Sequence, residues 1–206
     1  MERRVRLRPW SESDFWLLER ANEPAMTEHL GGPESPAKLL DRQRRYEALG
    51  AREPAAGRMF RIEWLTPDHE SGHPGPDAPA RPARPARPAG PSPAPAVTVG
   101  SIGFWERDWR GEAVYETGWA VLPEFQGRGL AAAALTELLA HIGAHGTRDS
   151  VHAFPGTDHP ASNAVCRRAG FTYLGDVDLA YPPGVPHPSC DWRHRVTPRT
   201  GITPSG

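Results

Sequence analysis

The sequence has few cysteines, no long apolar run and almost no excess of charge of either sign. Its two cysteines, Cys166 and Cys190, lie far apart and lack the spacing of metal ligands. We therefore expect no metal site, and we interpret both residues as small packed side chains of a reduced protein. No window is apolar enough to predict a membrane span.

The near balance of charge argues against partners that require a strongly basic protein. Lys and Arg number 24 against 25 Asp and Glu, which gives a formal net charge of -1. A cationic surface for nucleic acid or for an anionic membrane is therefore not expected. The first residues are not followed by an apolar run, so we predict no secretory signal and a cytoplasmic location.

One stretch, residues 67–95, differs in composition from the rest of the 206-residue chain. It holds 10 of the 24 prolines and a repeated Ala-Arg-Pro triplet. Because proline cannot donate ladder hydrogen bonds, we predict a disordered or polyproline-like loop insertion. It would interrupt a single domain over residues 1–197, followed by a frayed tail over 198–206. The alternative is a cationic arm whose arginines bind an acidic partner.

Hydrophobic periodicity predicts short strands on both sides of this insertion. They cover residues 3–8, 57–65, 97–105, 113–122, 150–154, 171–179 and 191–196. Helices are predicted after Ser11 or Ser13, over 36–49 with Gly50 as the stop, from Leu130 onward, and over 160–168 with Asp158 as the cap. A proline-rich loop is expected over 181–189. The order predicts an α/β (α+β) fold, with a mixed central sheet of about seven strands flanked by helices.

The most informative stretch joins the fourth strand to the helix that begins at Leu130. The apolar run 119–122 breaks at Pro123 and passes through Gly127 and Gly129 into a helical apolar stripe. Glycines let the backbone approach a ligand, and the free N–H groups of a helix start attract anions such as phosphate. Neither Gly-x-Gly-x-x-Gly nor Gly-Lys-Ser/Thr is present, which argues against dinucleotide and P-loop sites. The alternative is an ordinary strand–helix turn whose glycines serve packing.

Two motifs resemble those of the GNAT acyltransferases. Gln126-Gly127-Arg128-Gly129-Leu130-Ala131 matches the Gln/Arg-x-x-Gly-x-Gly/Ala signature of that family. Residues 158–171 resemble its Asn-x-x-Ser helix, which ends in Gly-Phe, and the order of elements is also that of the family. The opening Leu7-Arg8-Pro9-Trp10-Ser11 is similar to the ribosomal-protein N-acetyltransferase (RimJ/RimL-like) branch.

The resemblance implies the GNAT acyl-CoA N-acyltransferase fold, with acetyl-CoA as the co-substrate and no metal. The acceptor would be a primary amine of a small molecule or of a peptide, and the oligomeric state, including a homodimer, stays open. Family positions that contact the coenzyme correspond here to Trp119, Val121, Leu122, Gln126, Gly127, Arg128, Gly129, Leu130, Ala131, His159 and Ser162. His159 stands where the family usually has asparagine, so the contact with the pantetheine arm depends on a hydrogen bond from histidine instead.

Two residues are candidates for the chemistry. Glu116, in a Glu-x-Gly pattern, corresponds to a carboxylate that serves the family as base or substrate anchor; the alternative is a solvated strand residue. Ser162 occupies the position that hydrogen bonds or protonates the coenzyme sulfur; the alternative is an ordinary polar residue of the first helical turn. Tyr173 and His152 are weaker acid candidates, and each is more typical of a packed strand residue.

Two other classes of function stay open. One is a coenzyme-binding module without catalysis, which would bind acetyl-CoA but release no thiol with any amine. The other is an interaction protein that works through the Ala-Arg-Pro arm and would lose its partner when the arm is removed. The segments expected beside the acceptor, residues 10–32 and 181–189, carry no motif that identifies it.

Overall fold

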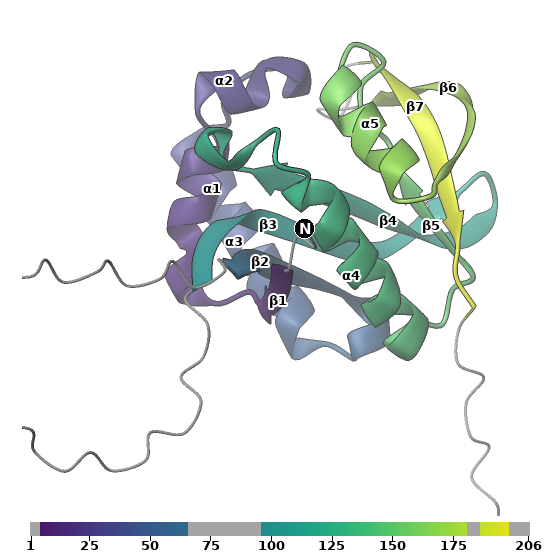
Figure 1. The fold of residues 1–206 in the computed structure, drawn as a ribbon, viewed down its shortest axis with the longest axis horizontal. Helices are drawn as coiled ribbons and strands as arrows, with labels where there is room; N and C mark the ends of the chain where they lie inside the picture. Colours follow the sequence, from purple (N-terminus) through teal and green to yellow (C-terminus); the bar gives the residue numbers. More distant parts are fainter. Residues whose placement is uncertain (1–4, 66–95, 181–185, 198–206) are drawn as a thin grey trace, which may run out of the picture.

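The computed structural model describes residues 5–65, 96–180 and 186–197, and seven strands within them form one mixed sheet (Figure 1). Their spatial order is β1-β2-β3-β4-β5-β7-β6, and of these neighbours only β4 and β5 run parallel. The predicted fold class is thus confirmed. The strands are β1 (Val5–Pro9), β2 (Gly57–Leu65), β3 (Ala96–Trp109), β4 (Glu112–Val121), β5 (Ser150–Ala153), β6 (Thr172–Ala180) and β7 (Pro186–Arg195).

Helices cover both faces of this sheet (Figure 1). One face carries α4 (Leu130–His145) and α5 (Pro160–Arg168). The other carries α1 (Phe15–Ala21) and α3 (Pro36–Ala51), and α1 is followed by the short α2 (Pro24–Thr27). Single 3-10 turns are η1 (Glu12–Asp14), η2 (Glu28–Leu30), η3 (Pro54–Ala56) and η4 (Pro123–Phe125). No helix in the described ranges is long and apolar enough to span a bilayer.

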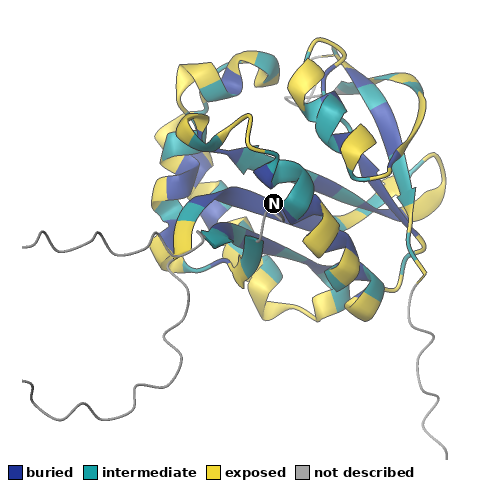
Figure 2. Ribbon diagram, viewed as in Figure 1, coloured by how far each residue is buried: buried dark blue, intermediate teal, exposed yellow. Residues whose placement is uncertain are grey.

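The alternation of β2 determines which side chains meet which helices. Phe60 and Ile62 belong to the core beneath α4, whereas Met59 packs with residues of α1 and α3. Figure 2 shows the middle strands buried between these layers. Each leucine-sized side chain that α4 buries contributes about 1.5–3 kcal/mol, which fixes this helix on the sheet. The buried residues of α4 are the predicted stripe: Leu130, Ala134, Leu135, Leu138, Leu139 and Ile142.

Two strands are longer than the sequence pattern indicates. β3 continues beyond the expected end at residue 105, because its hairpin with β4 pairs Trp109 with Glu112. β7 begins at Pro186, which pairs with Ala180 of β6, so the expected loop over 181–189 is wrong for its last residues. In both places pairing with a neighbouring strand extends the strand through residues of low strand propensity.

Two helix ends also differ from expectation. α3 runs through Gly50 to Ala51 instead of stopping before the glycine. The N-cap of α5 is His159 and not Asp158, whose carboxylate is hydrogen bonded to His29 at 3.0 Å. The predicted insertion over 67–95 and the predicted tail over 198–206 lie outside the described residues and stay predictions.

β4 and β5 separate soon after they pair. Their register has only Tyr115↔Val151 and Glu116↔His152, whereas β3 stays paired with β4 as far as Val121. Beyond Glu116, β4 therefore has one edge without a strand partner in the described part of the chain. This edge leads into the glycine turn, so the sheet opens beside the start of α4 (Figure 1).

Candidate functional site

The turn between β4 and α4 presents an uncapped helix start. Gly127 and Gly129 adopt φ values of 70° and 73°, in the left-handed region that glycine enters without strain. Gly129 is the N-cap residue of α4, and no side chain caps the helix there. A Cβ on Gly127 would meet nothing within 4 Å, so the space beside the turn is open. Free N–H groups and the helix dipole make this opening an anion site.

Side-chain contacts hold the turn in place. Gln126 Nε2 donates to the carbonyl oxygen of Val121 at 2.9 Å and lies 3.4 Å from Met26 Sδ. Arg128 donates to the carbonyl oxygen of Glu124 at 3.3 Å, and its guanidinium lies 5.5 Å from the ring centre of Trp64. Gln126 therefore braces the turn, while the charge of Arg128 stays beside the helix start.

The open edge of β4 carries the residues expected to meet the coenzyme arm. Trp119 is half-buried, and Val121 and Leu122 are buried. The N–H of Leu122 donates to the carbonyl oxygen of Val99 at 2.9 Å and is not free for a ligand. Backbone groups before Leu122 are the ones that the parting of β4 from β5 leaves accessible.

His159 is the N-cap residue of α5, and its side chain caps the helix. Its Nδ1 accepts a hydrogen bond from the backbone N–H of Ser162 at 3.0 Å, so the neutral ring carries its proton on Nε2. Burial lowers the pKa of His159, and the neighbouring His29, whose ring centre is 4.4 Å away, lowers it further. The ring is thus held neutral with one N–H donor left for a ligand.

Ser162 and Asn163 differ in what they can offer. The hydroxyl of Ser162 is half-buried and makes no hydrogen bond to any described residue. Asn163 is buried: its amide donates to the carbonyl oxygens of Gly156 and His159, and its oxygen accepts from Trp192 Nε1 at 2.7 Å. Asn163 therefore fixes the loop before α5 to β7, and Ser162 is the residue with a free hydroxyl.

Glu116 lies where β4 and β5 part, in an ion pair with Arg107. The Arg107 guanidinium also lies 5.2 Å from the ring centre of Trp109 and 4.9 Å from that of Phe154. The Glu116 side chain is 20% exposed, which is lower than expected for a solvated strand residue. The ion pair therefore places a cation on one carboxylate oxygen of Glu116, Oε2.

A buried pair beside Glu116 was only partly anticipated from the sequence. His152, opposite Glu116 in the β4–β5 register, is hydrogen bonded through Nδ1 to Asp191 at 2.7 Å. The other carboxylate oxygen of Asp191 accepts from Trp109 Nε1 at 2.9 Å. Asp191 does not belong to any motif recognised in the sequence, and it lies 39 positions after His152. Only the pairing of β5 with β7 in the sheet brings the two residues together.

Tyr173 is not placed to act as an acid. It lies exposed on β6, the edge strand, and its hydroxyl donates to Asp176 Oδ1 at 2.7 Å. This hydrogen bond raises the pKa of Tyr173 to about 12. A phenol with that pKa keeps its proton at neutral pH and already has an acceptor.

The short segment 24–30 touches both sides of the opening between β4 and β5. Met26 contacts Gln126 of the glycine turn. His29 contacts Asp158 and His159, at the start of α5. The structure thus brings Gln126 and His159, which the sequence places in separate motifs, to the two ends of one segment.

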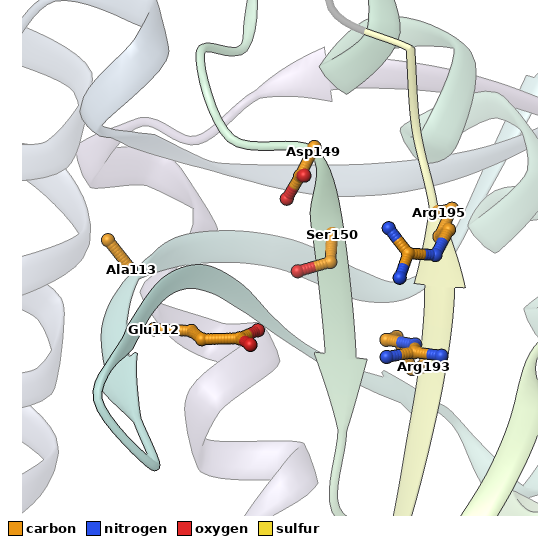
Figure 3. Close-up of a pocket in the computed structure, with 6 residues that line it drawn as sticks. All are labelled: Glu112, Ala113, Asp149, Ser150, Arg193 and Arg195. Atoms are coloured by element: carbon orange, nitrogen blue, oxygen red, sulfur yellow. The ribbon is translucent and has the colours of Figure 1, made fainter.

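A separate pocket of about 310 Å³ lies at the far end of β4 from the glycine turn. Figure 3 shows Glu112 on β4, Ser150 on β5 with Asp149 just before it, and Arg193 and Arg195 on β7. Because of this position, the pocket is distinct from the opening between β4 and β5 beside the start of α4. The described residues contain no cluster of three or more His, Cys, Asp or Glu suited to a metal ion. The pocket is lined by Glu112, Ala113, Asp149, Ser150, Arg193 and Arg195.

Comparison with known proteins gives one family and a set of structural relatives. The family model of the acetyltransferase (GNAT) domain matches residues 4–172. A RimL ribosomal L7/L12 alpha-N-protein acetyltransferase in complex with coenzyme A is 18% identical, with a TM-score of 0.61 over 93% of this chain and 94% of that chain. No curated protein sequence matches significantly.

Two further solved structures are similar over most of their length. Aminoglycoside acetyltransferase AAC(6')-Ib in complex with coenzyme A is 16% identical, with a TM-score of 0.59 over 93% of this chain and 95% of that chain. Spermidine N-acetyltransferase from Vibrio cholerae, in complex with CoA and spermine, is 13% identical, with a TM-score of 0.61 and the same coverage, 93% and 95%. At these identities the likeness is one of fold.

Proposed function

Because the chain belongs to the family of GNAT acetyltransferases, we propose that it transfers the acetyl group of acetyl-CoA to a primary amine bound in the same complex. The observation that carries this proposal is the opening of the sheet between β4 and β5, directly before the uncapped glycine start of α4. A phosphate group fits the helix start, and an extended chain fits the open strand edge beside it.

The coenzyme would occupy this opening from the turn inward. The N–H groups after Gly127 and Gly129 would hold the pyrophosphate, with the charge of Arg128 beside them. The pantetheine arm would follow the free edge of β4 at Trp119. At α5, the Nε2–H of His159 and the hydroxyl of Ser162 are free to donate to the arm and to the coenzyme sulfur.

The acceptor amine would enter beside Glu116. An amine is mostly an ammonium ion at neutral pH, and Glu116 already holds one cation, the Arg107 guanidinium, next to two aromatic rings. A carboxylate beside aromatic faces is a suitable anchor for a second cation. This arrangement favours Glu116 as substrate anchor over Glu116 as base.

The finer assignment is to the RimJ/RimL-like branch, with the cytoplasm as the compartment. It is supported by the opening Leu7-Arg8-Pro9-Trp10-Ser11 and by the structural similarity to RimL. The acceptor would then be a protein N-terminus or a small-molecule amine. The structural relatives include enzymes for both kinds of amine, so the class of acceptor must be identified by testing both.

A thiol-release screen tests the proposal. Purified protein and acetyl-CoA are incubated with an aminoglycoside, a polyamine or a peptide with a free N-terminus, and release of coenzyme thiol is followed against a blank without amine. We expect amine-dependent release with at least one class. Tight binding of acetyl-CoA without release for any amine would instead support a coenzyme-binding module.

A further inference from the structure

The face of the sheet opposite α4 carries a connected polar group at the point where β4 and β5 part. Glu116 and His152 are paired in parallel register, so their side chains project from the same face. His152 is hydrogen bonded to Asp191 of β7, and Asp191 to Trp109 of β3. Three strands besides β4 thus converge on the place where the thioester and the amine would meet.

The hydrogen bonds of Asp191 determine which nitrogen of His152 carries the proton. Burial by itself would raise the pKa of Asp191, but the hydrogen bonds from His152 and Trp109, with the nearby charge of Arg110, hold it below its usual value. The group is therefore a carboxylate, which only accepts hydrogen bonds. Nδ1 of His152 must then be the donor, and in the neutral ring Nε2 keeps its lone pair.

That lone pair is not used within the described part of the chain. Asp191, which binds Nδ1, lies on β7, and β5 separates β7 from β4. No described residue donates to Nε2. Oε2 of Glu116, the neighbour on β4, is paired with the Arg107 guanidinium, whereas Nε2 of His152 has no hydrogen-bond partner among the described residues.

We propose that His152 is the general base of the acetyl transfer and that Asp191 positions it. The proposal rests on the acetyltransferase function inferred above. The amine nitrogen attacks the thioester carbonyl carbon and forms the C–N bond, and the C–S bond breaks. The proton that the nitrogen loses passes to Nε2 of His152, directly or through one water. The bound ammonium ion has by then given its first proton to solvent. The coenzyme leaves as thiolate and takes the second proton from His152, which restores the neutral ring.

A general base must be unprotonated before it can act, so kcat/KM should fall on the acid side of the pH profile when His152 serves as the base. The charged groups that face His152 are Asp191 and Arg193 on β7, Glu116 on β4, Arg107 on β3, and Arg110 in the turn after β3.

His152→Gln tests the base, because its amide can still donate to Asp191 but cannot take a proton. We expect kcat to fall by about a hundredfold or more, with the acid limb of the pH profile lost. Acetyl-CoA affinity by calorimetry and the melting temperature should stay near those of the unmodified protein. Trp109→Phe is the matched control: it removes the other hydrogen bond to Asp191, leaves the base, and should lower kcat only severalfold.

A second variant covers the case in which His152→Gln is unstable. His152→Ala leaves a space of imidazole size, and added imidazole should restore amine-dependent thiol release if the missing group is a base. A kcat for His152→Gln within about threefold of the unmodified protein, or an unchanged acid limb, would overturn the proposal. So would failure of imidazole rescue in a folded His152→Ala that binds acetyl-CoA. Absence of thiol release by the unmodified protein would instead overturn the acetyltransferase function itself.

Discussion

The structure narrows the role of Glu116 beyond what its motif indicates. The motif around it allows a base or an anchor, and the ion pair with Arg107 favours the anchor. Glu116→Gln keeps the shape but removes the charge that would hold an ammonium ion. We expect KM for the amine to rise severalfold or more, with kcat and acetyl-CoA affinity much less affected.

Steady-state kinetics at a saturating acetyl-CoA concentration measure this split. Glu112→Gln is the matched control, since Glu112 lies on the same strand and face but lines the remote pocket. A fall in kcat of about a hundredfold with unchanged KM would identify Glu116 as the base. No severalfold change in either constant would make it a structural residue.

His141 on α4 should make the fold sensitive to acid. Burial, with contributions from His145 and Arg58, lowers its pKa from 6.5 to about 4. The unfolded chain therefore binds this proton below pH 6.5 while the folded chain does not until about 4, so stability falls as the pH drops through that window. At roughly 1.4 kcal/mol per pKa unit, the loss is at most about 3 kcal/mol.

Urea unfolding at neutral pH and at the acid end of this window measures the effect. His141→Leu should lose less stability on acidification than the unmodified protein, because the titrating group is gone. His145→Gln, at an exposed position of the same helix, removes only the smaller contribution of the His145 charge and leaves the burial of His141, so it should keep most of the acid loss. An equal acid loss in His141→Leu would show that other groups cause it.

The side-chain partners of individual residues could not be predicted from the sequence. The position of Glu116 on a strand follows from its motif, but its partner Arg107 depends on the register of the β3–β4 hairpin. The sequence favours Asp158 as the cap of α5 because aspartate is a common N-cap residue, yet His159 accepts the hydrogen bond from the N–H of Ser162. Such contacts depend on side-chain placement within a formed fold, which spacing alone does not determine.

Among the structural elements, the glycine turn before α4 offers a direct test of the proposed pyrophosphate site. Gly129→Asp adds a carboxylate and a strained φ at the helix start that we assign to the pyrophosphate. We expect coenzyme A binding to weaken strongly and binding of pantetheine without phosphate to change little. Calorimetry with the two ligands separates these effects.

The strain of a side chain at positive φ needs its own control. Gly111 in the β3–β4 hairpin has φ 82° and open space around its Cβ position, so Gly111→Asp adds similar strain away from the turn. Its coenzyme A affinity should match that of the unmodified protein. Equal losses for coenzyme A and pantetheine in Gly129→Asp would contradict the phosphate assignment.

Strong periodicity made most elements predictable. The stripe on α4 and the strand over residues 57–65 were found from the pattern alone, because each buries a regular apolar face. The extension of β3 to Trp109 and of β7 back to Pro186 was missed. Both ends contain proline, charged residues or turn-like sequence, and only pairing with a neighbouring strand keeps them extended.

For the whole molecule, the predicted insertion is the main untested feature. Its flanks are the paired ends of β2 and β3, where Leu65 lies opposite Ala96. A hairpin closed at this point should not need the intervening residues. We expect that replacing residues 68–94 with a short Gly-Ser linker leaves the free energy of unfolding within about half a kcal/mol and coenzyme affinity nearly unchanged. Urea unfolding and calorimetry check both, and a loss of several kcal/mol would show that the segment stabilises the domain.

The most direct test of acetyl transfer is its stoichiometry with the best acceptor from the amine screen. Coenzyme thiol and acetylated amine are quantified together, the second by mass spectrometry, for the unmodified protein and for Gly129→Asp. Acetyl transfer predicts equal amounts of thiol and acetylated amine, no release without amine, and a strong loss in the variant. Thiol release that does not depend on amine, or that leaves the amine unmodified, would contradict it.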